Sequence, residues 1–141
     1  VYQPHVGEDT ATIRSVRAAH VADGPGVAAC VVDGDGFNAL LAQDDQPAAR
    51  EIEGCVIHGS FGAIIRHGAE VAELYLGHGQ AIGAGDISIT AAGDQPIDAG
   101  LARAAGGWRY SSSAPIRVHV NSRTFDLPAG LNLPLPPGGK P

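Results

Sequence analysis

Hydrophobic and polar residues alternate with a period of two along most of this chain. In the segment 86–91, two isoleucines and an alanine alternate with Asp, Ser and Thr. Such alternation is typical of a β-strand with one buried face. The pattern predicts strands at 13–21, 27–32, 37–42, 61–66, 71–76, 86–91, 108–112, 117–121 and 124–127, with a less regular pattern at 50–57.

Clusters of glycine and small polar residues separate these segments. They predict turns at 23–26, 33–36, 67–68, 77–79, 83–85 and 106–107. Glycine suits tight turns because it adopts positive φ without steric cost. A single helical turn at 99–105 is the strongest competing pattern. The fold class expected is all-β, an antiparallel β-sandwich or β-roll of about ten short strands.

The alternating runs also indicate which side chains form the core. Those expected inside are Ile65, Leu74, Leu76, Ile87, Ile89, Ile116, Val118 and Val120. Residues 1–130 are predicted to form one sandwich domain, because a chain of 141 residues suits a single core. Residues 131–141 contain four prolines and are predicted to form an extended edge segment or tail.

Composition narrows the expected partners and location. The net charge of −6 argues against nucleic acid, because phosphate binding needs an excess of Lys and Arg. No apolar run approaches the length of about 18 residues that spans a membrane. The start at Val1, without a signal-peptide pattern, suits a processed secreted protein or a fragment, and an extracellular or periplasmic location is expected. Cys30 and Cys55 fit either one disulfide or two small buried thiols.

Metal and catalytic motifs are incomplete in this sequence. His58, His67 and His78 recur near predicted turns, but no carboxylate stands beside them at a ligand spacing. The run 33–38 begins like a calcium loop and then departs from it, so a β-turn is expected. The carboxylates at 44–45 are expected to be solvated turn residues. With no nucleophile elbow or phosphate-binding loop, the sequence predicts no catalytic residue, metal or cofactor.

One stretch of this acidic chain is basic. Residues 99–125 contain no Asp or Glu, and aromatic and cationic side chains alternate within them. Arg pairs with carboxylates and sulfates, and Trp or Tyr stacks on the apolar face of a sugar ring. Contact with acidic sugar is therefore predicted for Trp108, Arg109, Tyr110, Arg117 and His119. The alternative is that the two aromatic residues lie in the core and the arginines form a solvated strand face.

Three segments carry a resemblance to a known family through their strand rhythm and turn placement. They are 59–66 (GSFGAIIR), 71–79 (VAELYLGHG) and 108–118 (WRYSSSAPIRV). The stretch 59–120 resembles the C-terminal β-sandwich of heparinase II/III-type polysaccharide lyases. These lyases abstract the proton beside a uronate carboxylate with Tyr and His groups held mostly by a helical toroid and the sheet domain next to it. This sequence has no such toroid. The resemblance implies a region without activity of its own, so no catalytic residue is carried over.

Two hypotheses of function follow. The first is a non-catalytic β-sandwich module of a secreted polysaccharide-degrading enzyme, with a polysaccharide lyase as the larger chain. Its partners would be acidic polysaccharide or the remainder of that enzyme. The alternative is a structural subunit that self-assembles into a filament or surface layer through its edge strands and tail.

Overall fold

The computed structural model describes residues 12–21 and 26–140, and within them the chain forms twelve β-strands and no helix. Every strand pairing is antiparallel, which confirms the all-β prediction. Most of the turn expected at 23–26 lies outside the described residues. The strands are β1 (Ile13–Ala18), β2 (Val27–Gly34), β3 (Asn38–Asp44), β4 (Arg50–Ile52), β5 (Cys55–His67), β6 (Glu70–Ala84), β7 (Ile87–Ala91), β8 (Ile97–Ala104), β9 (Gly107–Ser112), β10 (Ile116–Val120), β11 (Arg123–Leu127) and β12 (Gly130–Pro134).

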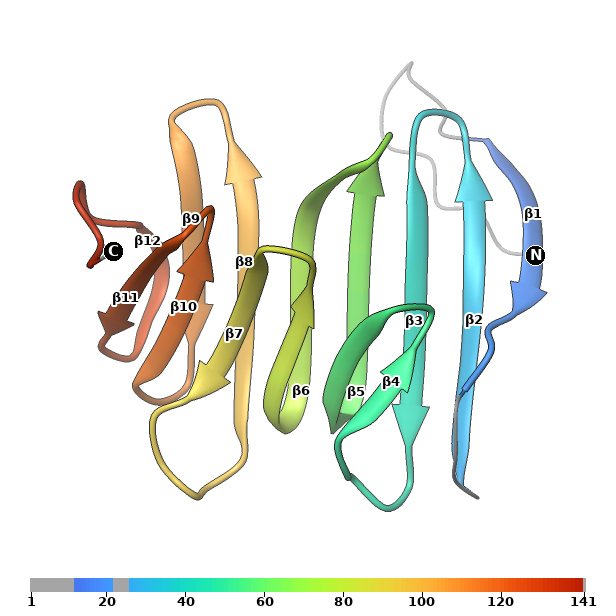
Figure 1. Cartoon of the computed structure of the whole chain (residues 1–141), viewed down its shortest axis with the longest axis horizontal. Coiled ribbons are helices and arrows are strands. Elements are labelled where there is room, and N and C mark those ends of the chain that lie inside the picture. The colour runs from blue at the N-terminus through green and yellow to red at the C-terminus, as the bar shows by residue number, and fades with distance from the viewer. Residues whose placement is uncertain (1–11, 22–25, 141) are drawn as a thin grey trace.

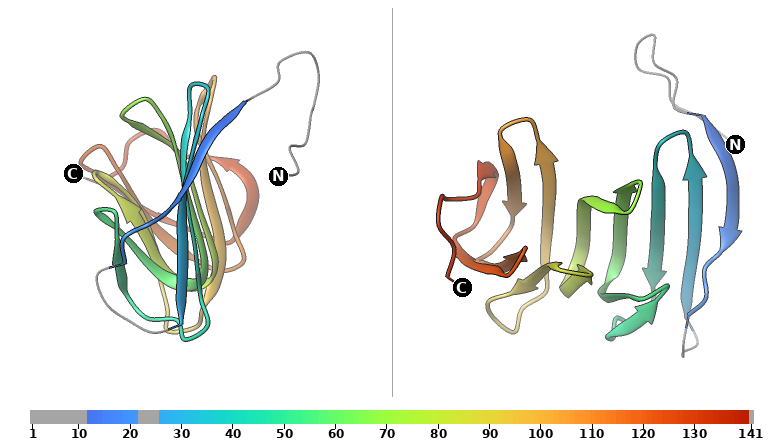
Figure 2. Two further views of the ribbon diagram at one scale, coloured as in Figure 1. Left: turned by 90° about the vertical axis from the view of Figure 1, so that its right-hand side faces the viewer. Right: turned by 45° about the horizontal axis from the view of Figure 1, so that its top comes forward.

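The long hairpin β5–β6 belongs to two layers at once (Figure 1). The second half of β5 pairs with β3 and the first half of β6 with β8, which gives a large sheet in the order β1-β2-β3-β5-β6-β8-β9-β12. The other halves pair with β4 and β7, which gives a small sheet in the order β4-β5-β6-β7-β10-β11. Figure 2 shows the large sheet edge-on, with β4 and β7 on one side of it.

The hairpin changes layer at a glycine-rich corner. The cluster at 77–79 was expected to be a turn, but β6 runs through it with a register shift opposite Gly59. A Cβ on Gly79 would collide with the carbonyl oxygen of His58, and one on Gly59 would come within 2.7 Å of Leu76 Cδ1. His78 adopts a φ of 46°, and its N–H donates to the Asp98 carboxylate at 2.8 Å. The glycines therefore permit two backbones to approach closely, which a sequence pattern cannot distinguish from a chain reversal.

The core lies between the two sheets. Seven of the eight side chains expected inside are buried there: Leu74, Leu76, Ile87, Ile89, Ile116, Val118 and Val120. Ile65 was the wrong choice, because its neighbour Ile64 is fully buried and Ile65 points to the opposite face of β5. The sequence offers an isoleucine on either side at this point, so alternation alone does not identify the inner face.

One strand, β8, is missing from the sequence-based prediction. The segment 99–105, for which a helical turn was the competing interpretation, is a strand instead: β8 covers nearly all of it and pairs with both β6 and β9. Its alanines and glycine lack the contrast between large apolar and polar side chains that reveals a strand. The tail begins as the edge strand β12 beside β9, and Lys140 then bridges to Thr124 of β11. The described residues contain no helix of the length and hydropathy needed to cross a membrane.

Candidate functional site

The face of the large sheet that points away from the small sheet carries exposed hydrophobic side chains. Tyr75 lies on this outer face because its neighbours along β6 are buried, and the pairing of β5 with β6 puts Phe61 on the same side. Val16 on the edge strand β1 is exposed as well. Phe61 is 42% exposed and Tyr75 is 59% exposed. Large exposed apolar groups gathered on one face mark an interaction surface more often than isolated ones do.

A trough of about 780 Å³ crosses this face over β5, β6, β8, β9 and β12. Phe61, Tyr75 and Leu131 provide its apolar surface. Each aromatic residue has a glycine as its cross-strand partner: Gly77 lies opposite Phe61, and Gly100 lies opposite Tyr75. A Cβ on Gly100 would stand 3.5 Å from Tyr75 Cε2, so the tyrosine ring lies close over the bare backbone. The two glycines thus leave room for rings that lie along the sheet.

Polar groups border the aromatic part of the trough. Asp98, Ser111 and Ser113 lie at one side. The Asp98 backbone N–H donates to Ser113 Oγ at 3.0 Å, while the Asp98 carboxylate accepts from the His78 N–H. These contacts hold the carboxylate at the corner of the hairpin, so its position is set by the fold.

A smaller hollow of about 140 Å³ continues the trough beyond Tyr75 and shares Ser111 with it. It is bordered by Glu73, Arg109 and Asn132. Arg109 Nε donates to Asn132 Oδ1 at 2.8 Å, and a second guanidinium nitrogen donates to the Asn132 backbone carbonyl. The trough and hollow together form one surface of aromatic rings followed by fixed polar groups. We call this surface the outer trough.

The structure does not bring the five predicted sugar-contacting residues together. Arg109 lies on the outer face of the large sheet, whereas Tyr110 is only 3% exposed and Trp108 packs partly against the core. Arg117 and His119 lie on β10, on the outer face of the small sheet. The two arginines therefore point to opposite sides of the sandwich.

Two of the four arginines in the basic stretch form ion pairs with acidic residues that lie outside it. Arg117 Nε donates to Asp126 at 2.8 Å, and Arg103 forms an ion pair with Glu70 of β6. His119 lies 3.2 Å from the Thr124 hydroxyl. A run without acids in the sequence does not make a basic surface, because antiparallel pairing sets carboxylates of neighbouring strands beside it.

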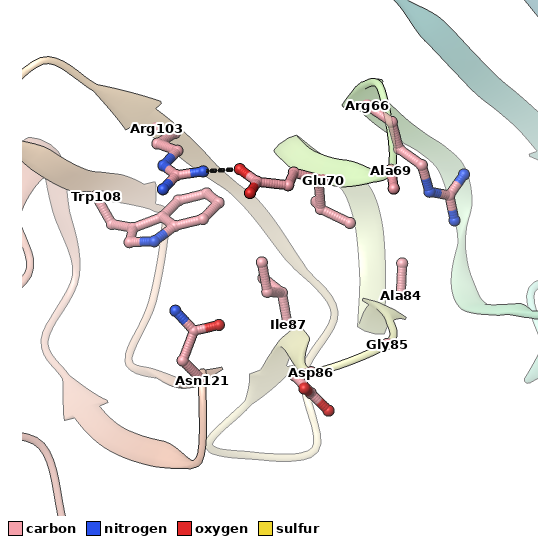
Figure 3. Close-up of a pocket in the computed structure, with 11 residues that line it drawn as sticks. Arg66, Ala69, Glu70, Ala84, Gly85, Asp86, Ile87, Arg103, Trp108 and Asn121 are labelled. Carbon is pink, nitrogen blue, oxygen red and sulfur yellow. Dashed lines mark hydrogen bonds and ion pairs between the residues drawn. The ribbon is translucent and has the colours of Figure 1, made fainter.

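A second cavity, of about 490 Å³, opens at one end of the sandwich between the two sheets. Trp108 forms one wall, and Figure 3 shows Arg103 beside its indole ring with Asn121 on the other side. Arg66 stands across the opening, and Ile87 lies between the walls. The sequence pattern singled out Trp108 but not the other residues that line this cavity. They come from four turns that lie side by side only in the folded chain.

The cysteines and histidines show no shared site. Cys30 and Cys55 are both free thiols. Cys30 lies on the outer face of β2, and Cys55 is buried at the start of β5. Arg66 donates to Cys55 Sγ at 2.9 Å. Within residues 12–21 and 26–140 no group of three His, Cys, Asp or Glu side chains is placed to hold a metal ion. The run 33–38 forms the bend between β2 and β3, as expected.

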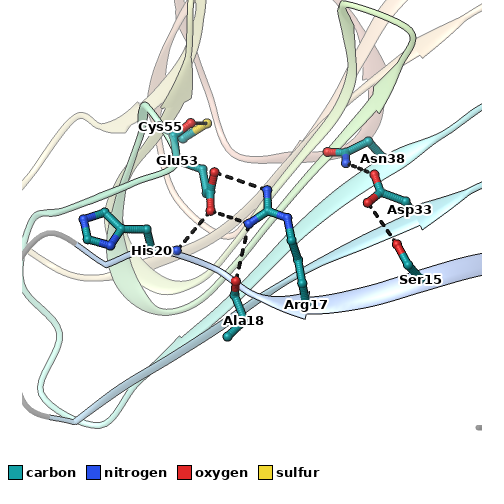
Figure 4. A network of polar contacts seen from close by, with 8 residues as sticks. All are labelled: Ser15, Arg17, Ala18, His20, Asp33, Asn38, Glu53 and Cys55. Carbon is teal, nitrogen blue, oxygen red and sulfur yellow. Dashed lines mark hydrogen bonds and ion pairs between the residues drawn. The ribbon is translucent and has the colours of Figure 1, made fainter.

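A polar network ties the edge strand β1 to the β4–β5 turn (Figure 4). Arg17 donates from two nitrogens to the two carboxylate oxygens of Glu53, at 2.7 and 3.3 Å, and the His20 N–H donates to one of them at 3.0 Å. These donors, the Arg17 guanidinium first, lower the pKa of Glu53 from 4.5 to about 2. The network anchors the sheet edge and lies on the face opposite the outer trough.

Asp44 is not the solvated turn residue that the sequence suggested, since it is only 5% exposed. Its carboxylate accepts from Arg50 Nε at 2.9 Å and from the Gln46 backbone N–H at 2.9 Å. These bonds, with Arg50 the largest contributor, lower the pKa of Asp44 despite its burial. The pair closes the loop between β3 and β4 and has a structural role. Its neighbour Asp45 is exposed, as expected.

Comparison of the chain with models of known families, with curated proteins and with solved structures returned no match.

Proposed function

We propose that this chain is a non-catalytic β-sandwich module that binds carbohydrate through the outer trough, of the kind attached to secreted polysaccharide-degrading enzymes. The observation that carries the proposal is the pair of exposed rings, Phe61 and Tyr75, lying along an uncovered sheet face with fixed polar groups beside them. The resemblance to the sandwich of heparinase II/III-type lyases supports the same class of module.

Sugar rings have one face of C–H groups and an edge of hydroxyls. The C–H face packs well on an aromatic ring, and the hydroxyls need donors and acceptors at its margin. Phe61 and Tyr75 stand on neighbouring strands, at diagonal positions that are about 7 to 8 Å apart in an antiparallel pair. Two successive sugar units of an extended chain would therefore each have a ring to lie on. Ser111, Arg109 and Asn132 then face the hydroxyls of the next unit.

The charges in the outer trough favour an uncharged chain. It carries two carboxylates, Asp98 and Glu73, against the single guanidinium of Arg109. A polyuronate would meet net repulsion here, in a protein that already has a net charge of −6. A neutral glycan meets none, and its hydroxyls can both donate to the carboxylates and accept from Arg109.

The alternative of a self-assembling subunit finds less support in these strands. Exchange of the tail between copies would first have to break the pairings that the tail makes in its own chain. Here β12 pairs with β9, and Lys140 exchanges backbone hydrogen bonds with Thr124 at 2.8 and 2.9 Å. The register shift in β12 and Pro134 also interrupt the edge that another strand would extend.

Calorimetric titration of the full chain with neutral and uronic-acid hexasaccharides tests the proposal. We expect measurable affinity for a neutral hexasaccharide and a weaker response to an oligouronide. Tyr75→Ala should reduce the affinity about tenfold, because ring stacking contributes up to about 1.5 kcal/mol beyond area burial. Val56→Ala is the matched control, an exposed apolar residue on the small sheet. Equal affinities for Tyr75→Ala and the parent protein, or the absence of binding by any glycan, would overturn the proposal.

A further inference from the structure

The cavity at the end of the sandwich has a construction separate from that of the outer trough. Its walls come from the inner sides of both sheets, where the chain reverses between β5 and β6, β6 and β7, β8 and β9, and β10 and β11. Ala69, Ala84 and Gly85 line this cavity of about 490 Å³, and their small side chains take up little of its space. The outer trough shares none of its lining residues.

Trp108 supplies an aromatic surface to this end cavity. The indole is half-buried against the core, and part of it lines the cavity. The guanidinium of Arg103 lies beside the ring and forms an ion pair with Glu70, and both of these side chains are more than half exposed (Figure 3). The amide of Asn121 approaches from the opposite wall. A flat apolar surface is thus framed by planar groups that donate and accept hydrogen bonds.

The charges of the end cavity cancel. Arg66 and Arg103 supply two positive charges, and Glu70 and Asp86 supply two negative charges. A charged ligand would gain no net attraction from this set, whereas adjacent hydroxyl groups, each both donor and acceptor, match alternating guanidinium, carboxylate and amide groups. The cavity is at the lower end of the 300 to 1,000 Å³ range of small-molecule sites, roughly enough for a single ring.

We propose that the end cavity is a binding site for one neutral monosaccharide unit, stacked on Trp108 and hydrogen-bonded by Glu70, Arg103 and Asn121. This site goes beyond the function proposed for the outer trough, because it uses different residues and takes a single sugar. In this proposal Trp108 stacks on a neutral sugar. It does not take part in the contact with acidic sugar that was predicted from the sequence.

Trp108 is the only tryptophan of the chain, so its fluorescence reports on this cavity alone. Methyl β-glucoside and methyl β-galactoside are titrated into the full chain. For at least one of them we expect a saturable change in emission with a dissociation constant of about 1 mM, together with protection from acrylamide quenching. Glu70→Gln should weaken binding about fivefold, the loss of one hydrogen bond to a charged acceptor.

Asp126→Asn is the matched control, since it also breaks an exposed ion pair between strands, with Arg117, but on the outer face of the small sheet. It should leave the titration unchanged. Tyr75→Ala should leave it unchanged too, so that failure of the outer trough and failure of the end cavity are separable. The proposal is overturned if neither glycoside changes Trp108 emission. It is also overturned if Glu70→Gln and Asp126→Asn have equal effects, or if glycine betaine or another zwitterion produces the larger change.

Discussion

Ile64 and Ile65 show how one position along a strand separates core from surface. Ile64 is fully buried between the sheets, whereas Ile65 lies on the outer face of β5. Ile64→Ala should lower the free energy of unfolding by about 2 to 5 kcal/mol, because it leaves a cavity in a packed core. Ile65→Ala should lower the free energy of unfolding by clearly less. Urea denaturation of both variants measures the difference, and equal losses would show that the inner face of β5 is misplaced.

Asp44 and Asp45 are adjacent carboxylates with opposite roles. Asp44→Ala removes the acceptor of the Arg50 guanidinium and of the Gln46 N–H, so we expect a loss of roughly 1.5 to 3 kcal/mol for hydrogen bonds to a charged group. Asp45→Ala changes an exposed side chain and should lie within about 0.5 kcal/mol of the parent protein. Denaturant midpoints at neutral pH compare the two. A larger effect at Asp45 would contradict the assigned roles.

Glu53 links stability to acidity. The pKa of Glu53 in the folded state is about 2, below the ordinary 4.5. The stabilisation of the folded state by its ionised carboxylate is therefore complete above pH 4.5 and is lost as the pH falls toward 2. Glu53→Gln should therefore be less stable than the parent protein at pH 6 and differ less from it at pH 2. Thermal unfolding of both proteins across this range measures the convergence. A stability difference that stays constant with pH would show that Glu53 titrates normally.

At the scale of elements, the crossing of β5–β6 between the sheets depends on glycine. Gly79→Ala would place a methyl group against the His58 carbonyl and should cost about 1 to 3 kcal/mol, as overpacking commonly does. Gly93→Ala is the control, because no atom stands within 4 Å of its added Cβ and its φ is not in the left-handed region. Chemical denaturation of the two variants gives the comparison. A tolerated Gly79→Ala would mean that the strands do not approach closely at this corner.

Alternation predicted most strands because their two faces differ sharply in polarity. Ile87 and Ile89 face the core, while Ser88 and Thr90 face outward. Alternation is lost where small residues reduce that contrast, as in β8, where Gly100 lies under Tyr75. The glycines at 77–79 resembled a turn because glycine permits close backbone approach as readily as it permits chain reversal. These errors concern contacts between strands far apart in sequence, which a local pattern does not contain.

At the scale of the whole molecule, the candidate site depends on which strands share a face. The sequence identified Arg109, which lies in the outer trough, but grouped it with Arg117 on the opposite side of the sandwich. Phe61 and Tyr75 were visible as an aromatic residue on each of two predicted strands. Their exposure became evident only from the pairing order, because no element covers the outer face over β5, β6 and β8 within the described residues.

Titration of the isotopically labelled full chain with a neutral hexasaccharide, followed by backbone amide chemical shifts, tests whether the outer trough binds carbohydrate. We predict saturable shifts centred on Phe61, Tyr75 and Ser111, spreading along β6, β8 and β9 on the large sheet. Amides around Arg117 on the small sheet should not move. Shifts concentrated on β10 and β11, or none at any residue, would contradict the claim that the outer trough binds carbohydrate.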